Sequence, residues 1–223
     1  MKIGINLVGV SYNDGTLGRY RDYRDALDTF MKNVVNPLKE EGHDVVYYLF
    51  TYDSIEKENI LNTYTPVKKS TFLDENFNKA GGGDKLSNNI KLISYSYIKS
   101  LEELLNEDLD LVISTRYDIS FNVNPFKEFQ YDFNKCNYLW KEPEFTHVPL
   151  VSDTFIVFPH SMTQDLINSI IEMETNPPSG VGIAMHNIYT PMVNQVGEAN
   201  VKIVCDTNYA SHSNPYFKLT RRA

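Results

Sequence analysis

The sequence lacks most of the features that would place it at once in a common protein class. It has two cysteines and no apolar run near the roughly 20 residues that span a membrane, so we expect no membrane span. Cys136 and Cys205 lie outside any Cys-x-x-Cys spacing and read as free thiols of a reducing compartment. A strand is predicted directly at the N-terminus, where a signal peptide would lie, so we expect a cytoplasmic protein.

Positive charge is also scarce. There are 21 Lys and Arg residues against 29 Asp and Glu, a formal net charge of −8. A general nucleic-acid binder needs a basic face, so we expect no nucleic-acid partner, although a nucleotide held in a pocket remains compatible. Neither the Gly-x-Gly-x-x-Gly pattern of dinucleotide folds nor the Gly-x-x-x-x-Gly-Lys-Ser/Thr phosphate loop occurs. Aromatic rings are plentiful, with 15 Tyr and 12 Phe, and suit core packing first and stacking on a sugar or base second.

The hydrophobic pattern predicts an α/β chain. A strand at 1–10, a polar loop, a helix that ends at Gly42 and a strand at 44–50 form a parallel βαβ unit. Further strands are predicted at 66–72, 109–115, 138–140, 154–158 and 201–205, and further helices at 86–104, 163–174 and 182–196. Pro191 predicts a kink or an early break in the last helix, and the tail from Asp206 reads as irregular. We expect one domain with a central, mostly parallel mixed sheet flanked by helices, an α/β/α sandwich.

The most informative stretch runs from Leu109 to Phe121, where a continuous apolar run ends in Arg116-Tyr117-Asp118. Open α/β sheets bind ligands outside the carboxyl ends of such strands. Side chains two residues apart on extended chain point to the same side, so Arg116 and Asp118 should lie together. The carboxylate suits a hard cation and the guanidinium suits phosphate oxygens, but a plain ion pair that closes the strand is the alternative.

Two other strand ends carry candidate nucleotide-binding residues. The loop that begins at Val8-Gly9-Val10 leaves the first strand where a nucleotide would lie, and it carries two arginines able to meet phosphate, Arg19 and Arg21. Thr51-Tyr52-Asp53 ends the second strand, where Tyr52 can stack on a base and Asp53 can accept from ribose hydroxyls. Asp53 suits equally well the N-cap of a helix at 55–61.

Three residues of the second half are candidates for chemistry. Asp153 opens the strand at 154–158 and could act as a general base on a hydroxyl, or could be a solvated turn residue. His186 lies on a predicted helix, where histidines are more often packing residues than ligands. His212, in the polar tail, could add a metal or phosphate contact, although no second ligand stands at a fixed spacing from it.

Together these pieces resemble the nucleotide-sugar glycosyltransferases of the GT-A type. Element order matches over the whole chain: the opening strand with Gly9, Thr51-Tyr52-Asp53, Thr115-Arg116-Tyr117-Asp118, Ser152-Asp153-Thr154-Phe155 and Met185-His186. In that family an Asp-x-Asp motif at this strand end holds Mn²⁺ or Mg²⁺ against the donor diphosphate. Here Arg116 replaces the first Asp, so the resemblance implies Asp118 and His212 as metal ligands. It implies Val8 to Val10, Arg19, Thr51 to Asp53, Arg116, Tyr117 and His186 as donor-binding residues.

The loop Asn6 to Asn13 with Gly18-Arg19-Tyr20-Arg21 is similar to the small capsid-glycan transferases of large algal DNA viruses, the chloroviruses. This resemblance implies transfer of a sugar, most simply from a UDP-sugar, to a hydroxyl of a glycan or glycoprotein acceptor, with viral capsid glycosylation in the host cytoplasm as the setting. Residues 1–118 would form the nucleotide-binding half of one domain, 1–223, and residues 119–223 the acceptor-binding half. The metal and Arg116 would stabilise the departing diphosphate, and Asp153 would be the base of an inverting displacement.

Two other functions are compatible with the residues. A sugar-1-phosphate nucleotidyltransferase would carry a glycine-rich loop with Arg and Lys directly after the first strand, which 11–18 does not provide. A non-catalytic nucleotide- or carbohydrate-binding module would keep Thr51, Asp53 and the aromatic rings, but would not need Asp118 and Asp153 together.

Overall fold

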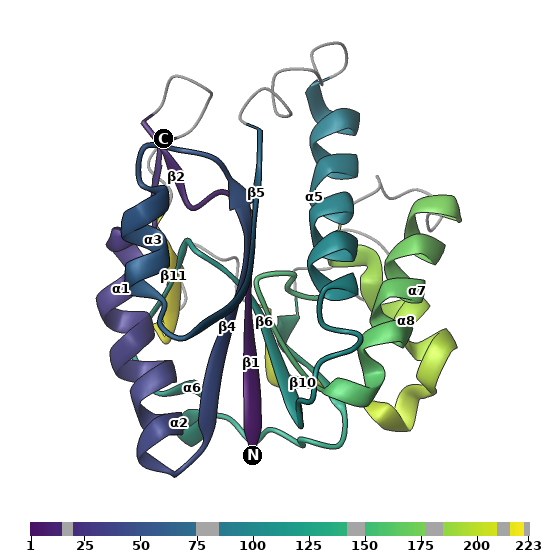
Figure 1. Ribbon diagram of the computed structural model, residues 1–223. Helices are drawn as coiled ribbons and strands as arrows, with labels where there is room; N and C mark the ends of the chain where they lie inside the picture. The colour runs from purple at the N-terminus through teal and green to yellow at the C-terminus, as the bar shows by residue number, and fades with distance from the viewer. Residues whose placement is uncertain (15–19, 75–84, 142–149, 177–184, 209–214, 221–223) are drawn as a thin grey trace.

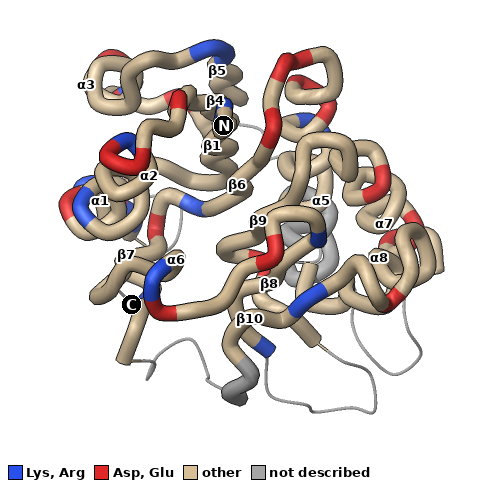
Figure 2. The backbone as a smooth tube through the Cα atoms, turned by 90° about the horizontal axis from the view of Figure 1, so that it is seen from below, with Lys and Arg blue, Asp and Glu red and all other residues tan. Residues whose placement is uncertain are grey.

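The computed structural model describes residues 1–14, 20–74, 85–141, 150–176, 185–208 and 215–220. Seven strands form one sheet in the order β10-β8-β9-β6-β1-β4-β5, which Figure 2 shows nearly end-on. Their bounds are β1 (Lys2–Val8), β4 (Asp44–Tyr52), β5 (Val67–Leu73), β6 (Leu111–Arg116), β8 (Cys136–Lys141), β9 (Phe155–Pro159) and β10 (Val201–Asn208). β9 runs antiparallel to both of its neighbours, and the remaining pairs are parallel.

Helices cover both faces of this sheet (Figure 1). One face carries α1 (Arg24–Phe30), α2 (Asn36–Glu40) and α3 (Lys57–Thr63), and the other carries α5 (Lys85–Glu102), α7 (Thr163–Thr175) and α8 (Tyr189–Val196). The predicted fold class, a mostly parallel mixed sheet in an α/β/α sandwich, is confirmed. No helix in the described ranges is both long and apolar enough to cross a membrane.

The remaining described elements are short. They are β2 (Tyr12–Asn13), β3 (Arg21–Asp22), β7 (Ile119–Phe121), β11 (Phe217–Leu219), α6 (Pro125–Glu128), a π-helical segment at Met31–Val35, and single turns of 3-10 helix at His160–Met162, Met185–Ile188 and Glu198–Asn200. β2 pairs with β3, and β11 pairs with β7, each antiparallel.

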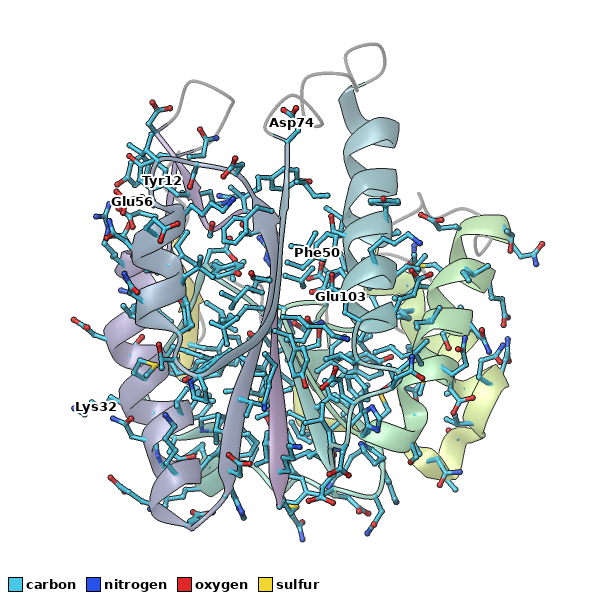
Figure 3. All side chains as sticks on the ribbon, viewed as in Figure 1. Tyr12, Lys32, Phe50, Glu56, Asp74 and Glu103 are labelled. Carbon is cyan, nitrogen blue, oxygen red and sulfur yellow. The ribbon has the colours of Figure 1, made fainter. Side chains whose placement is uncertain are left out.

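Side chains that alternate along the strands build two hydrophobic cores. On β1, Ile3, Ile5 and Leu7 are buried in the core under α1 and α3. On β4, alternate residues such as Tyr48 and Phe50 are buried in the core under α5 and α7. Figure 3 shows side chains filling both sides of the sheet, while the labelled Lys32 points away into solvent. Burial on both faces explains why these strands read as nearly continuous apolar runs.

The first helical segment contains a π turn between α1 and α2, and Pro37 explains its position. The amide of Asn36 donates to the carbonyl of Met31, five residues earlier. Proline has no amide hydrogen and its ring clashes with the carbonyl four residues before it, so the wider turn relieves a conflict that a regular helix would have here. The helix ends near Gly42, which has a φ of +82°, in agreement with its predicted role as C-cap.

Two predictions about the last third of the chain are wrong. The tail from Asp206 is not all irregular, because β10 continues to Asn208 and β11 follows. Phe217 of β11 is fully buried and stacks on Trp140 at 4.3 Å between ring centroids, so tertiary packing, not a long local pattern, makes this short strand. The helix expected over 182–196 begins as a 3-10 turn at Met185, and Pro191 lies in the first turn of α8, where a missing amide hydrogen costs little. Residues 182–184 lie outside the described part.

The strand order reverses next to β1. The chain moves outward from β1 through β4 to β5 and then returns to the other side of β1 to form β6. Ligands of open α/β sheets bind at such a reversal, outside the carboxyl ends of the strands. This edge is the upper one in Figure 1. The antiparallel β9 begins at the same edge, since Phe155 pairs with Thr115, so the residues before Phe155 join the carboxyl ends of β1, β4 and β6.

Candidate functional site at the carboxyl edge of the sheet

Arg116 and Asp118 form a bidentate ion pair at the end of β6. Arg116 donates from Nε to Asp118 Oδ1 at 2.9 Å and from Nη2 to Oδ2 at 2.7 Å. Tyr117 and Asp118 form a turn rather than extended chain, so the predicted proximity is correct although its reason, alternation along a strand, is not. A planar guanidinium that matches both carboxylate oxygens has a fixed orientation.

A second arginine approaches the same carboxylate from another element. Arg21 of β3 places Nε 3.6 Å from Asp118 Oδ2, and the two side chains are 16% and 7% exposed. Burial alone would lower the pKa of Arg116, but the charges of Asp118 and Asp153 outweigh it and raise that pKa. Both arginines therefore stay charged at any physiological pH. The sequence indicates Arg21 only as one of two loop arginines able to meet phosphate; its place next to the end of β6 depends on the β2–β3 hairpin, which no motif marks.

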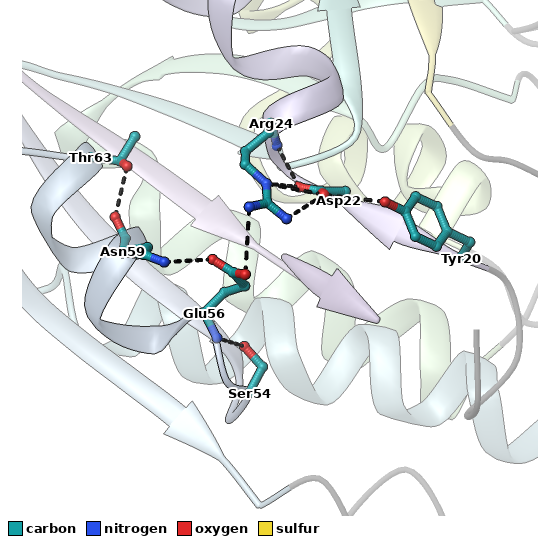
Figure 4. A network of polar contacts seen from close by, with 7 residues as sticks. All are labelled: Tyr20, Asp22, Arg24, Ser54, Glu56, Asn59 and Thr63. Atoms are coloured by element: carbon teal, nitrogen blue, oxygen red, sulfur yellow. Dashed lines mark hydrogen bonds and ion pairs between the residues drawn. The ribbon is translucent and has the colours of Figure 1, made fainter. Parts of the chain in front are cut away.

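A polar network holds this hairpin against α3 (Figure 4). Arg24 donates to both carboxylate oxygens of Asp22, the residue after Arg21, at 2.6 to 3.0 Å. The same guanidinium lies 3.5 Å from Glu56, at the start of α3. Tyr20 adds a hydrogen bond to Asp22 at 3.2 Å. Because these contacts fix Asp22, the residue next to Arg21, they also set where the Arg21 guanidinium meets Asp118.

Asp153 brings a second carboxylate to this edge. It is 5% exposed, and its Oδ1 has no hydrogen-bond partner among the described residues. His186 places Nδ1 4.0 Å from that oxygen and 3.1 Å from the carbonyl of Val151. A carbonyl only accepts, so His186 Nδ1 carries a hydrogen and donates it. The hydroxyl of Tyr97 on α5 donates to the backbone carbonyl of Asp153. A buried carboxylate oxygen without a donor is costly, which makes it a place where a ligand hydroxyl gains a strong hydrogen bond.

The end of β1 offers backbone rather than side chains. The side chain of Val8 is buried in the core and Val10 is half-buried. Gly9 has a φ of +104°, and its amide donates to the carbonyl of Phe50 at 3.1 Å. A Cβ at Gly9 would meet no atom within 4 Å, so the requirement for glycine is conformational and the space above it is open.

The residues predicted at the end of β4 point in different directions. Thr51 is buried and exchanges hydrogen bonds with Ser11, which fixes the loop after β1. Tyr52 lies on the α5 side, where burial raises its pKa and a hydrogen bond with Ser96 opposes that rise. Asp53 is exposed and lies 3.8 Å from Lys57; it is not the N-cap of α3, a position that Glu56 occupies. Of this group, Asp53 alone presents a carboxylate to solvent.

One predicted site residue, Tyr117, does not contribute its side chain to this edge, and two others cannot be placed. Tyr117 is 3% exposed, and its ring packs edge-on against Tyr64 in the core under α1 and α3. Its side chain is therefore a core residue rather than a donor-binding one. Arg19 and His212 lie outside the described residues.

The described side chains at Asp118 do not fit a divalent cation. A cation would bind about 2.1 Å from the carboxylate oxygen. That oxygen is only 2.7 Å from Arg116 Nη2, which keeps the cation within about 5 Å of the guanidinium. Charges of +2 and +1 at about 5 Å repel by about 7 kcal/mol at an effective dielectric constant of about 20, which cancels a large part of the attraction to Asp118, and both carboxylate oxygens already accept from Arg116. Nor do the described residues contain any group of three or more His, Cys, Asp and Glu side chains arranged to hold a metal ion.

Comparison with known proteins adds no family assignment. No protein-family model matches this chain, and no curated protein matches it either. The geometry of the site itself combines two arginines suited to phosphate with one carboxylate suited to a hydroxyl, and all three lie at a strand-order reversal.

Proposed function

We propose that the protein is a glycosyltransferase that moves a sugar from a nucleoside-diphosphate sugar, most simply a UDP-sugar, to a hydroxyl of a glycan or glycoprotein acceptor. One observation carries the proposal: the arginine-bound end of β6 and the carboxylate of Asp153 meet at the strand-order reversal although they are distant in sequence. The sugar-nucleotide class and a viral capsid acceptor come from the resemblance described above.

The reaction divides between the two parts of the edge. Arg116 and Arg21 meet the diphosphate and offset the charge that grows on it as the bond to the anomeric carbon breaks. The acceptor hydroxyl forms a new bond to that carbon, and its proton passes to Asp153. The electron pair of the broken bond leaves with the nucleoside diphosphate. A single displacement of this kind inverts the anomeric configuration.

The test is the isosteric change Asp153→Asn. Donor cleavage is measured as nucleoside diphosphate released from UDP-glucose, UDP-galactose and UDP-N-acetylglucosamine, and then from GDP- and dTDP-sugars, with water or added glycans as acceptor. The variant should lose about 10²- to 10⁴-fold in turnover while UDP affinity changes less than about threefold. It should fold normally, because Asp153 Oδ1 has no hydrogen bond to lose.

Asp44→Asn is the matched control, since Asp44 is exposed at the opposite end of β4. Its turnover should equal that of the wild type. Release of diphosphate at an unchanged rate by Asp153→Asn would remove Asp153 as the base. A failure of every nucleoside diphosphate to bind the wild type would contradict the proposed function itself and favour a carbohydrate-binding module.

A further inference from the structure

We propose that Arg116 and Arg21 bind the diphosphate without a divalent cation, and that Asp118 serves to position these arginines. The inference rests on the proposed function, because it names the groups that meet the diphosphate in that reaction. It also replaces the role that the resemblance implied for Asp118, that of a metal ligand.

The ion pair leaves part of the Arg116 guanidinium available. A guanidinium has five N–H donors, and Asp118 takes two of them, one from Nε and one from Nη2. No further hydrogen bond from this side chain is found within the described residues, and the side chain is 18% exposed. Asp118 therefore fixes the plane of the guanidinium while three donors remain for a ligand. A donor set that is already fixed loses little conformational freedom when an anion binds.

The local charges also favour an anion over a cation. Arg21 and Arg116 contribute two positive charges and Asp118 one negative charge, which leaves this group at +1. The negative charge of Asp153 also acts on Arg116, and its Oδ1 lies 4.0 Å from His186 Nδ1. A cation placed on Asp118 would have to compete with two guanidinium groups. Phosphate oxygens would instead lie next to the positively charged arginines, on the side away from Asp118.

Calorimetric titration of the wild type with three probes tests the inference: UDP in EDTA, UDP in Mn²⁺, and inorganic pyrophosphate in EDTA. We expect UDP affinities in EDTA and in Mn²⁺ to agree within about threefold, and pyrophosphate to bind without metal. This comparison needs no variant and so does not depend on the folding of a mutant.

Variants then separate positioning from metal binding. Arg116→Gln should weaken UDP and pyrophosphate in EDTA by about 10- to 100-fold. Arg21→Gln should weaken them less, since its contact with Asp118 is longer. Asp118→Asn should weaken UDP in EDTA by about 3- to 10-fold, because an amide offers Arg116 one acceptor oxygen where the carboxylate offers two. Lys135→Gln is the control for loss of a positive charge and should leave UDP affinity unchanged, since Lys135 precedes β8 at the opposite edge of the sheet and pairs with Asp132.

The outcomes distinguish the inference from the function on which it rests. UDP binding more than about tenfold tighter in Mn²⁺ than in EDTA, with that gain lost in Asp118→Asn, would overturn the inference and leave the transferase proposal standing. Pyrophosphate binding in EDTA without binding of any nucleoside diphosphate would support the anion site and overturn the transferase proposal. No binding of any probe would overturn both.

Discussion

Replacing Phe217 by alanine should destabilise the protein strongly although the residue lies in a strand of only three residues. Phe217 is fully buried, stacks on Trp140 at 4.3 Å and lies 6.4 Å from the ring of Phe121. Truncation of a buried phenylalanine costs about 3 to 5 kcal/mol, from lost transfer energy and the cavity left behind. In a protein of this size each kcal/mol lowers Tm by about 2 to 4 °C, so we expect a fall of about 6 to 20 °C.

Thermal unfolding followed by circular dichroism measures this effect. Lys218→Ala is the control on the same strand, because the next side chain is exposed and its loss should change the free energy of unfolding by less than about 0.5 kcal/mol. A fall in Tm of less than about 2 °C for Phe217→Ala would refute the packing of β11 against β7 and β8. Equal falls for both variants would show that the strand matters through its backbone and not through this ring.

Three further predictions concern other parts of the molecule. Gly4→Ala should lower the free energy of unfolding by about 1 to 3 kcal/mol in denaturant titration, because the added Cβ would lie 2.6 Å from Leu109 Cδ1; an unchanged midpoint would contradict the close packing there. Burial raises the pKa of the Cys136 thiol to about 12, so iodoacetamide at pH 8 should leave Cys136 unmodified in the native protein and alkylate it after denaturation, as peptide mass spectrometry would report. Burial alone would raise the pKa of Asp22, but hydrogen bonds from Arg24 outweigh it and lower that pKa. The loss of unfolding free energy caused by Asp22→Asn should therefore be full above about pH 4 and should fade as pH falls through the lower native pKa. The same loss of unfolding free energy at pH 7 and pH 3 would refute this linkage.

The sequence predicted the sheet well because strands that are buried on both faces have a recognisable local pattern of apolar residues. Continuous apolar runs such as Leu111 to Ile113 identify strands, and the glycine at Gly42 marks where the first helical segment ends. The π turn before Pro37 was not predicted, since a proline inside a helical pattern indicates a conflict but not how the backbone resolves it.

The site was predicted only where its residues adjoin strands. Arg116, Asp118 and Asp153 could be selected because polar side chains interrupt apolar runs at strand ends. The contact of Arg21 with Asp118 and that of Tyr97 with Asp153 could not be predicted, because these residues reach the edge through a hairpin and a helix whose positions are set by tertiary packing. Tyr117 shows the opposite error: it adjoins the motif in sequence, but the turn directs its ring into the core.

The hydrogen bonds between the end of β11 and Asp118 have a consequence for folding during synthesis. The amide of Thr220 donates to the backbone carbonyl of Asp118 at 2.9 Å, and a longer contact joins its hydroxyl to the same oxygen, across 102 residues of sequence. During synthesis, at about 5 to 20 residues per second, the central strands emerge well before this partner does. For several seconds a nascent chain can hold the central strands while the Arg116–Asp118 edge still lacks the hydrogen bond from Thr220. This edge therefore gains that contact only after the strands that carry it have been made.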